Sequence, residues 1–175
     1  PNFNEMAGDK IVLKDCKCGC AHNEEGGVAT IPTARAASDF EALRLATEKA
    51  ANRPKVFMLT IGNLAMRLAR SQFSANFFAC AGYEIIDNLG FNSVEEGINA
   101  AMEKKADIVV LCSSDDEYAT YAPEAFKLLN GRAEFVVAGN PACTEELQAA
   151  GITNFVHVRS NVLETLQAFN AKLLK

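Results

Sequence analysis

Residues 55–82 read KVFMLTIGNLAMRLARSQFSANFFACAG, and this stretch decides the fold of the chain. Its apolar run at 56–59 is typical of a strand that is covered on both faces in a parallel sheet. The turn at 60–63 leads into a helix with one apolar face, and Gly82 is placed to end that helix. A strand, a turn and a helix form the first unit of an open α/β domain, in which ligands usually bind at the carboxyl ends of the strands. The apolar face of the helix consists of Met66, Phe73, Phe77 and Cys80.

A chain of 175 residues with 49% hydrophobic content can bury a sizeable core as one domain plus an arm. Its net charge of -5 and its pI near 5.1 argue against nucleic acid or an acidic membrane surface as the main partner. No apolar run approaches the roughly 20 residues that span a bilayer, so we expect no membrane partner. Six cysteines in a chain with this much core indicate reduced thiols, and we expect a cytoplasmic protein.

Residues 1–35 lack a sustained period and contain glycine and proline, which predicts an arm or linker ahead of a domain at 36–175. The arm holds four zinc-type side chains spaced two residues apart, so an extended chain would place them on one face. Successive ligands would then lie about 6.6 Å apart, whereas zinc sites normally leave two to four residues between ligands so that a turn can bring the sulfurs together. The cluster is a weak candidate metal site, and unpaired thiols on an arm are the alternative. Its members are Cys16, Cys18, Cys20 and His22.

From residue 36 onward, apolar strands alternate with helices that carry capping signals. Ser113 or Ser114 is expected to cap one helix, which ends at 130–131 (Asn-Gly) and has a kink or restart at Pro123. Three other helices open with a serine or asparagine that is followed three residues later by glutamate: Ser38 with Glu41, Ser93 with Glu96, and Asn161 with Glu164. Further strands are predicted at 83–87, 108–112, 135–138 and 155–158, and a short helix at 144–151.

Strands that alternate with helices in this way predict a parallel sheet with right-handed crossovers. The simplest arrangement is a flavodoxin-like α/β fold, with five strands in the order 2-1-3-4-5 and helices on both faces.

The strand ends show no recognisable catalytic group. The turn at 60–63 has one glycine and no lysine, so it is neither a phosphate-binding loop nor a dinucleotide fingerprint. The stretch SSDDE at 113–117 places three carboxylates at a helix start, where they would satisfy the helix dipole and repel phosphate. Neither His22 nor His157 is placed to activate Cys112, so we expect a buried structural thiol there and a hydrogen-bonded strand residue at His157. We therefore predict no catalytic residue in this chain.

Four segments together resemble the C-terminal domain of the small (beta) subunit of heterodimeric methylmalonyl-CoA mutases: RPKVF at 53–57, RLARSQFSANFF at 67–78, GYE at 82–84 and VEEG at 94–97. The similarity covers about residues 36–175 and is most specific at 53–97. The resemblance implies a cobalamin-domain-like fold in the tail of a longer subunit. It also implies a large catalytic subunit as partner, which carries adenosylcobalamin and interconverts methylmalonyl-CoA and succinyl-CoA.

The catalytic subunits of this family bind adenosylcobalamin through an Asp-x-His-x-x-Gly motif after the first strand. There His ligates cobalt, Asp orients the His, and Gly leaves room for the nucleotide tail of the cofactor. The matching positions here are Ala65, Arg67 and Arg70, and arginine stays protonated with no lone pair for cobalt. A serine pair of the family maps near Ser113, and one member of a glycine pair remains as Gly139. The resemblance thus implies that the cobalamin-binding positions of this chain are degenerate.

Two functions are compatible with this pattern. The first is a scaffold that binds no cofactor itself and contacts the catalytic subunit. The alternative is a genuine cobalamin-binding domain that holds the cofactor base-on, without a protein histidine. One face of the helix that follows the first strand is either a contact surface for the catalytic subunit or a solvated stripe above a buried one. That face consists of Arg67, Arg70, Ser71 and Ser74, with Phe77 and Phe78 further along.

Overall fold

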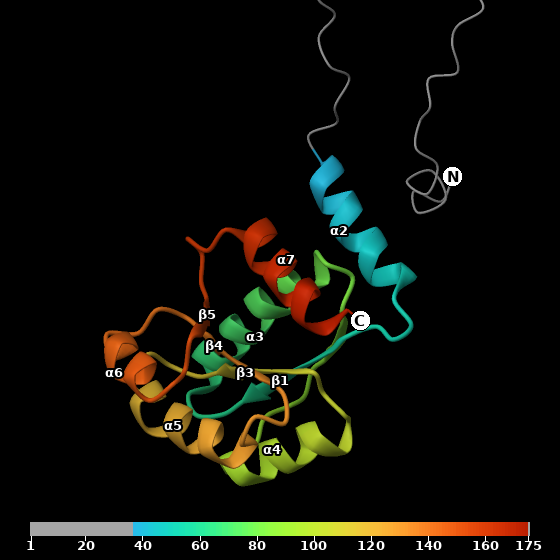
Figure 1. The fold of residues 1–175 in the computed structure, drawn as a ribbon. Helices are drawn as coiled ribbons and strands as arrows, with labels where there is room; N and C mark the ends of the chain where they lie inside the picture. Colours follow the sequence, from blue (N-terminus) through green and yellow to red (C-terminus); the bar gives the residue numbers. More distant parts are fainter. Residues whose placement is uncertain (1–36, 175) are drawn as a thin grey trace, which may run out of the picture.

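A parallel five-stranded sheet forms the centre of the molecule in the computed structural model, which describes residues 37–174 (Figure 1). The strands lie in the order β2-β1-β3-β4-β5, and each neighbouring pair is parallel. The flavodoxin-like order predicted from the sequence is confirmed. The strands are β1 (Lys55–Thr60), β2 (Glu84–Ile86), β3 (Ile108–Cys112), β4 (Glu134–Ala138) and β5 (Asn154–Val156).

The central strands are the most apolar because both of their faces are covered by helices. All residues of β3 are buried, and in β1 only Lys55 is half-exposed. Thr60 pairs with Cys112, so β1 and β3 end level at one edge of the sheet, which we call the carboxyl edge. The edge strands β2 and β5 are three residues long and shorter than the sequence pattern predicted.

Helices cover the sheet in two layers (Figure 1). One core cluster lies between the sheet and α4, α5 and α6, and contains Phe57 and Leu59 of β1. The second lies between the sheet and α2, α3 and α7, and contains Val56 and Met58. Alternate residues of one strand therefore supply opposite cores, as the pleat requires. The helices are α2 (Ser38–Lys49), α3 (Leu64–Ala79), α4 (Val94–Glu103), α5 (Tyr118–Leu129), α6 (Thr144–Ala149) and α7 (Val162–Leu173).

Two of the three capping pairs act as the sequence predicts. The Glu96 backbone N–H donates to the Ser93 hydroxyl at 3.2 Å, and the Glu164 N–H donates to the Asn161 side-chain oxygen at 3.2 Å. These contacts satisfy backbone donors at the start of α4 and α7 that have no partner within the helix. The prediction at Ser38 is wrong, because Ser38 is already inside α2 and the N-cap residue, Ala37, has no side-chain hydrogen bond to offer.

The exposed and buried faces of α3 differ from the sequence prediction. Met66 and Cys80 were assigned to the apolar face, but Met66 is 36% exposed and Cys80 is exposed. Two serines of α3, Ser71 and Ser74, are buried. Their small side chains let the helix lie close to the strands. The predicted contact surface is wrong for four of its members, which are buried inside this chain: Ser71, Ser74, Phe77 and Phe78.

The ends of α5 follow one expectation and contradict another. The helix ends at Asn130, which has left-handed backbone angles, as the Asn-Gly sequence predicts. It starts at Tyr118, with Glu117 in the N-cap position, so neither Ser113 nor Ser114 caps it. Pro123 lies inside the helix, which continues through it.

A buried polar network joins three elements on the α2/α7 side of the sheet. The Tyr83 hydroxyl donates to the Asn170 side-chain oxygen at 2.6 Å, and the Thr47 hydroxyl lies 3.4 Å from the same oxygen. The Asn170 amide donates to the Leu43 carbonyl oxygen at 3.2 Å. Burial raises the pKa of Tyr83 well above its ordinary value, so the hydroxyl remains a donor. Asn170 therefore fixes α2 and α7 against the start of β2.

We expect Asn170→Ala to lower the free energy of unfolding by about 2 kcal/mol, because the Tyr83 hydroxyl and the Leu43 carbonyl would remain buried without this partner. The control is Gln167→Ala, which removes an exposed amide from the same helix and should change stability by less than about 0.5 kcal/mol. Urea unfolding of the two variants checks this. Equal stability of the two variants would show that the network contributes nothing.

Candidate functional site

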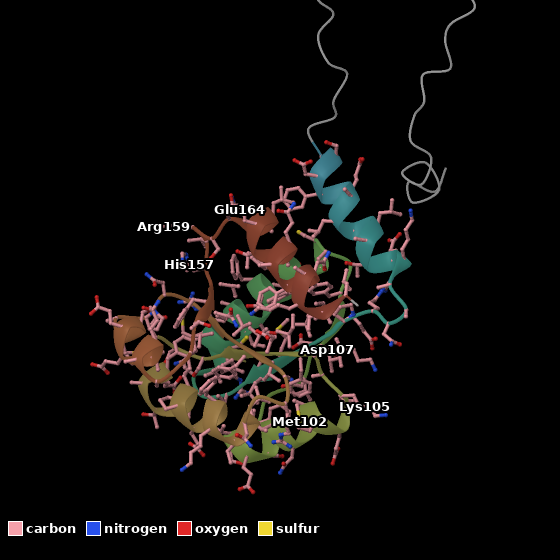
Figure 2. All side chains as sticks on the ribbon, viewed as in Figure 1. Met102, Lys105, Asp107, His157, Arg159 and Glu164 are labelled. Carbon is pink, nitrogen blue, oxygen red and sulfur yellow. The ribbon has the colours of Figure 1, made fainter. Side chains whose placement is uncertain are left out.

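The candidate site lies at the carboxyl edge, between the β1–α3 turn (61–63) and the β3–α5 loop (113–117). β2 lies on one side of β1, and β3 and the later strands lie on the other side, so the strand order reverses at β1. Open α/β sheets usually bind their ligands at such a reversal, beyond the carboxyl ends of the strands. Figure 2 labels His157 and Arg159, which follow β5 at this edge, and Lys105 and Asp107, which precede β3 at the opposite edge.

The Glu117 carboxylate joins the two loops. Its Oε2 atom accepts the Ser113 hydroxyl at 2.6 Å, the Ser114 hydroxyl at 2.7 Å and the Ser114 backbone N–H at 3.2 Å. The same oxygen accepts the Asn63 backbone N–H at 3.1 Å, from across the crevice. We call these four contacts the Glu117 bridge. It closes the space between the ends of β1 and β3 with a side chain of the protein itself.

The hydrogen bonds of the Glu117 bridge stabilise the ionised carboxylate. The Ser113 hydroxyl is the largest cause, followed by the Ser114 hydroxyl, and together with the backbone donors they lower the pKa of Glu117 from 4.5 to about 2. A carboxylate whose pKa is lowered in the folded state adds stability above pH 4.5, and this contribution is lost as the pH falls toward 2. The bridge is therefore complete at neutral pH.

Gly62 makes the close approach of Glu117 possible. A Cβ atom at this position would overlap the Glu117 carboxylate, and the residue has a φ of +79°, which L side chains rarely adopt. The glycine that the sequence places in the turn therefore makes room for a side chain 55 positions later in the chain.

Arg67 occupies the neighbouring part of the carboxyl edge. Its guanidinium donates to the Gly62 carbonyl at 3.4 Å and to the Leu89 carbonyl at 3.1 Å, which ties α3 to the β2–α4 loop. A Cβ atom on Gly90 would come within 2.6 Å of the Arg67 Cζ atom, so the guanidinium lies directly against that loop. Arg67, which the resemblance matches to the cobalt ligand of a cobalamin domain, is thus a packed cation in this chain.

Arg70 forms an ion pair at the carboxyl edge, beside the end of β4. Its guanidinium pairs with the Asp115 carboxylate at 3.0 Å, and the arginine side chain is 23% exposed. A Cβ atom on Gly139, at the end of β4, would lie 3.3 Å from the Arg70 Cζ atom and 3.2 Å from the Asp115 Oδ1 atom. The glycine predicted as a remnant of a cofactor site therefore lies under an ion pair between α3 and the β3–α5 loop.

Asn88 anchors the loop that follows β2. Its side-chain oxygen accepts the Thr60 hydroxyl at 2.5 Å and the Gly90 N–H at 3.0 Å, and its amide donates to the Met58 carbonyl. Sequence reasoning missed Asn88 because no local motif marks an asparagine that binds the end of a distant strand.

The cysteine and the histidine near this edge offer no nucleophile and base pair. Cys112 is fully buried, and burial raises the pKa of its thiol to about 12, so it is a structural thiol as predicted. His157 lies one residue beyond β5, and its Nδ1 atom accepts the Arg159 backbone N–H at 3.2 Å. It is hydrogen-bonded as expected, but in a turn and not in the strand.

The residues at the matched motif positions do not fit the lower ligand of cobalamin. Ala65, Arg67 and Arg70 lie in the first two turns of α3, and none carries a lone pair that could bind cobalt. Ala65 is exposed and has no group to orient a ligand. Ser113 is buried and donates to Glu117, so its hydroxyl is already used within the chain.

The cluster at Cys16, Cys18, Cys20 and His22 lies outside the described residues and stays an expectation. Within residues 37–174, no group of three or more metal-binding side chains is close enough to hold an ion. In the same part of the chain, no helix is long and apolar enough to cross a membrane.

The comparisons with known proteins identify the relatives of this chain. It is 68% identical over 174 residues to the methylmalonyl-CoA mutase small subunit of Porphyromonas gingivalis, a match that covers 98% of this chain and 28% of that protein. This confirms the resemblance to methylmalonyl-CoA mutase small subunits. The small subunit of Streptomyces virginiae is 32% identical over 103 residues, covering 57% of this chain and 17% of that protein. A probable small subunit of Mycobacterium tuberculosis is 32% identical over 96 residues, covering 53% and 16%.

The chain spans less than a third of the length of these curated small subunits. No protein-family model matches it. The relationship to the small subunits is therefore carried by the sequence similarity to individual proteins.

We expect Gly62→Ala to lower the free energy of unfolding by about 3 kcal/mol, because the added methyl group displaces the Glu117 carboxylate and the backbone is strained. The matched control is Gly131→Ala, where φ is +69° but nothing lies within 4 Å of the added Cβ atom. That variant should lose only the backbone part, about 1 kcal/mol. Urea unfolding measures both, and equal losses would mean that Glu117 does not press on Gly62.

Proposed function

We propose that this chain is the cobalamin-domain-like, C-terminal part of a methylmalonyl-CoA mutase small subunit, and that it serves as a scaffold without catalytic groups of its own. In this proposal the partner is the large catalytic subunit, which carries adenosylcobalamin and interconverts methylmalonyl-CoA and succinyl-CoA. The high identity to the P. gingivalis small subunit supports the assignment to that subunit. The reduced thiols expected from the sequence support a cytoplasmic location.

The observation that carries the scaffold proposal is the filling of the carboxyl edge by the side chains of the chain itself. Arg67, which the resemblance matches to the cobalt ligand, donates to the Leu89 carbonyl, Arg70 pairs with Asp115 next to Gly139, and Glu117 bridges the loops that follow β1 and β3. A cofactor tail that entered here would have to displace two guanidinium groups and a carboxylate from their hydrogen bonds. Each such displacement has a cost, because groups removed from their partners must find new ones.

Most of the contact surface predicted from the sequence is buried inside this chain. Ser71, Ser74, Phe77 and Phe78 are buried, so they cannot contact a partner without unfolding α3 from the sheet. Only the arginines of that predicted face reach the surface, and both are engaged at the carboxyl edge. We therefore assign no contact residue of the large subunit to this face of α3.

Titration of the purified 175-residue chain with hydroxocobalamin and adenosylcobalamin tests the proposal. We expect no saturable heat in calorimetry and no change in the absorbance of the corrinoid up to high micromolar cofactor. The positive control is a cobalamin domain that contains the complete Asp-x-His-x-x-Gly motif, measured under the same conditions.

Two outcomes would contradict the scaffold proposal in different ways. Saturable one-to-one heat without a change in cobalt coordination would support the alternative, a domain that binds cobalamin base-on. Saturable heat together with the absorbance change of a new axial ligand would show that a residue of this chain binds cobalt. That residue could not be Arg67, because arginine stays protonated.

A further inference from the structure

Helix α2 packs on α7 at the periphery of the molecule (Figure 1). Of its 12 residues, all of which the structure describes, only Leu43 and Thr47 are buried. Burial of apolar side chains is the main force that holds a helix on a core, so α2 is held less firmly than α5. Helix α5 also has 12 residues and buries four of them: Tyr118, Ala122, Ala125 and Leu129.

Two polar contacts of α2 converge on Asn170 of α7. The Asn170 amide donates to the Leu43 carbonyl at 3.2 Å, and the Asn170 side-chain oxygen lies 3.4 Å from the Thr47 hydroxyl. The same oxygen accepts the Tyr83 hydroxyl at 2.6 Å, from the start of β2. Separation of α2 from α7 breaks the first two contacts together and leaves the Tyr83–Asn170 hydrogen bond in place.

The contact between α2 and α7 is incompletely filled, and the segment after α2 is exposed. A groove of about 310 Å³ runs along the contact. Residues 51–53 are exposed, whereas Pro54 is buried and its carbonyl accepts the Glu84 N–H at 2.9 Å. The part of the chain that is bonded to the sheet therefore begins at Pro54. The groove is lined by Asp39, Ala42, Leu43 and Ala46 of α2 and by Gln167 and Asn170 of α7.

We propose that α2 is a releasable strap: residues 38–53 leave α7 as a unit while the five-stranded sheet and its other helices stay folded. A helix of 12 residues is marginal in water on its own, so α2 loses its helical structure when it leaves α7. Residues 38–53 then form a tether that spans about 50 Å when fully extended.

Release of the strap changes how the domain is connected. In the proposed function, on which this consequence rests, the chain is the C-terminal part of a longer small subunit. Helix α2 then lies between the preceding part of that subunit and the α/β domain. Release of α2 lets the domain change its position relative to the rest of the subunit without unfolding.

Amide hydrogen exchange of the full 175-residue chain tests the strap. It is measured residue by residue by NMR, at a series of urea concentrations below the unfolding transition. The amides of Thr47 and Glu48 report on α2, and those of Phe126 and Lys127 in α5 are the internal reference. We expect the α2 amides to exchange at least about 100-fold faster than the α5 amides. Their exchange should depend little on urea because release exposes little surface, whereas exchange in α5 should rise steeply.

Two variants test what holds the strap. Asn170→Ala removes both polar contacts and should speed exchange in α2 about 30-fold, the factor that corresponds to the about 2 kcal/mol expected for this variant, with the small dependence on urea unchanged. Gln167→Ala is the matched control on the exposed face of α7 and should change exchange in α2 by less than about twofold. Leu43→Ala removes the main apolar contact of α2 and should release it, while the amide signals of β1 and β3 stay those of the folded sheet.

Equal exchange rates and equal urea dependence in α2 and α5 would overturn the inference, because α2 would then open only when the whole domain unfolds. Loss of the folded signals of β1 and β3 in Leu43→Ala would overturn it as well, and this variant decides the matter if Asn170→Ala does not fold. The proposed function has a separate readout, since cobalamin binding by the wild type would contradict the scaffold role whatever the exchange of α2 shows.

Discussion

The contact between the Glu117 carboxylate and the Asn63 backbone N–H is the interaction on which the carboxyl edge depends. It joins residues 54 positions apart, and it connects the turn after β1 to the loop after β3. These two strands are neighbours that end level, so one side chain is long enough to span the gap between their loops. Because the same oxygen also accepts both serine hydroxyls, the loop that carries Glu117 is fixed by its own residues before it reaches across.

The other contacts of the edge are arranged around this bridge. Gly62 and Gly139 leave room for Glu117 and for the Arg70–Asp115 pair, and Arg67 holds the turn against the loop after β2. In a sheet of this type the carboxyl edge is where a ligand would bind. Here Arg67 and Arg70, at two of the positions that the resemblance matches to a cofactor motif, donate to backbone carbonyls and to the Asp115 carboxylate of the same chain.

The sequence predicted those parts of the structure that local pattern controls. Continuous apolar runs located β1, β3 and β4, and the capping pairs at Ser93 and Asn161 started their helices as expected, because both residues of each pair lie within one turn. Ser71 and Ser74 were misassigned, since a small polar residue on a helix indicates a solvated face unless the helix lies very close to a sheet. The sequence indicates Glu117 only as part of a helix start, because its spacing to Ser113 and Ser114 is local. Its distant partner, Asn63, comes within hydrogen-bond distance only because β1 pairs with β3. The capping pair at Ser38 failed because the helix begins one residue earlier than the motif requires.

The pKa of the Glu117 carboxyl group in the intact chain is the most direct test of whether the Glu117 bridge holds the carboxyl edge together. The side-chain carboxyl carbon can be followed by 13C NMR between pH 6 and the acid limit of the folded state. We predict that Glu117 stays ionised well below its ordinary pKa of 4.5, with a midpoint near 2, because four donors hold the carboxylate. A midpoint at or above 4.5 would show that the carboxylate is not held by these donors, and the carboxyl edge would then have to be regarded as open.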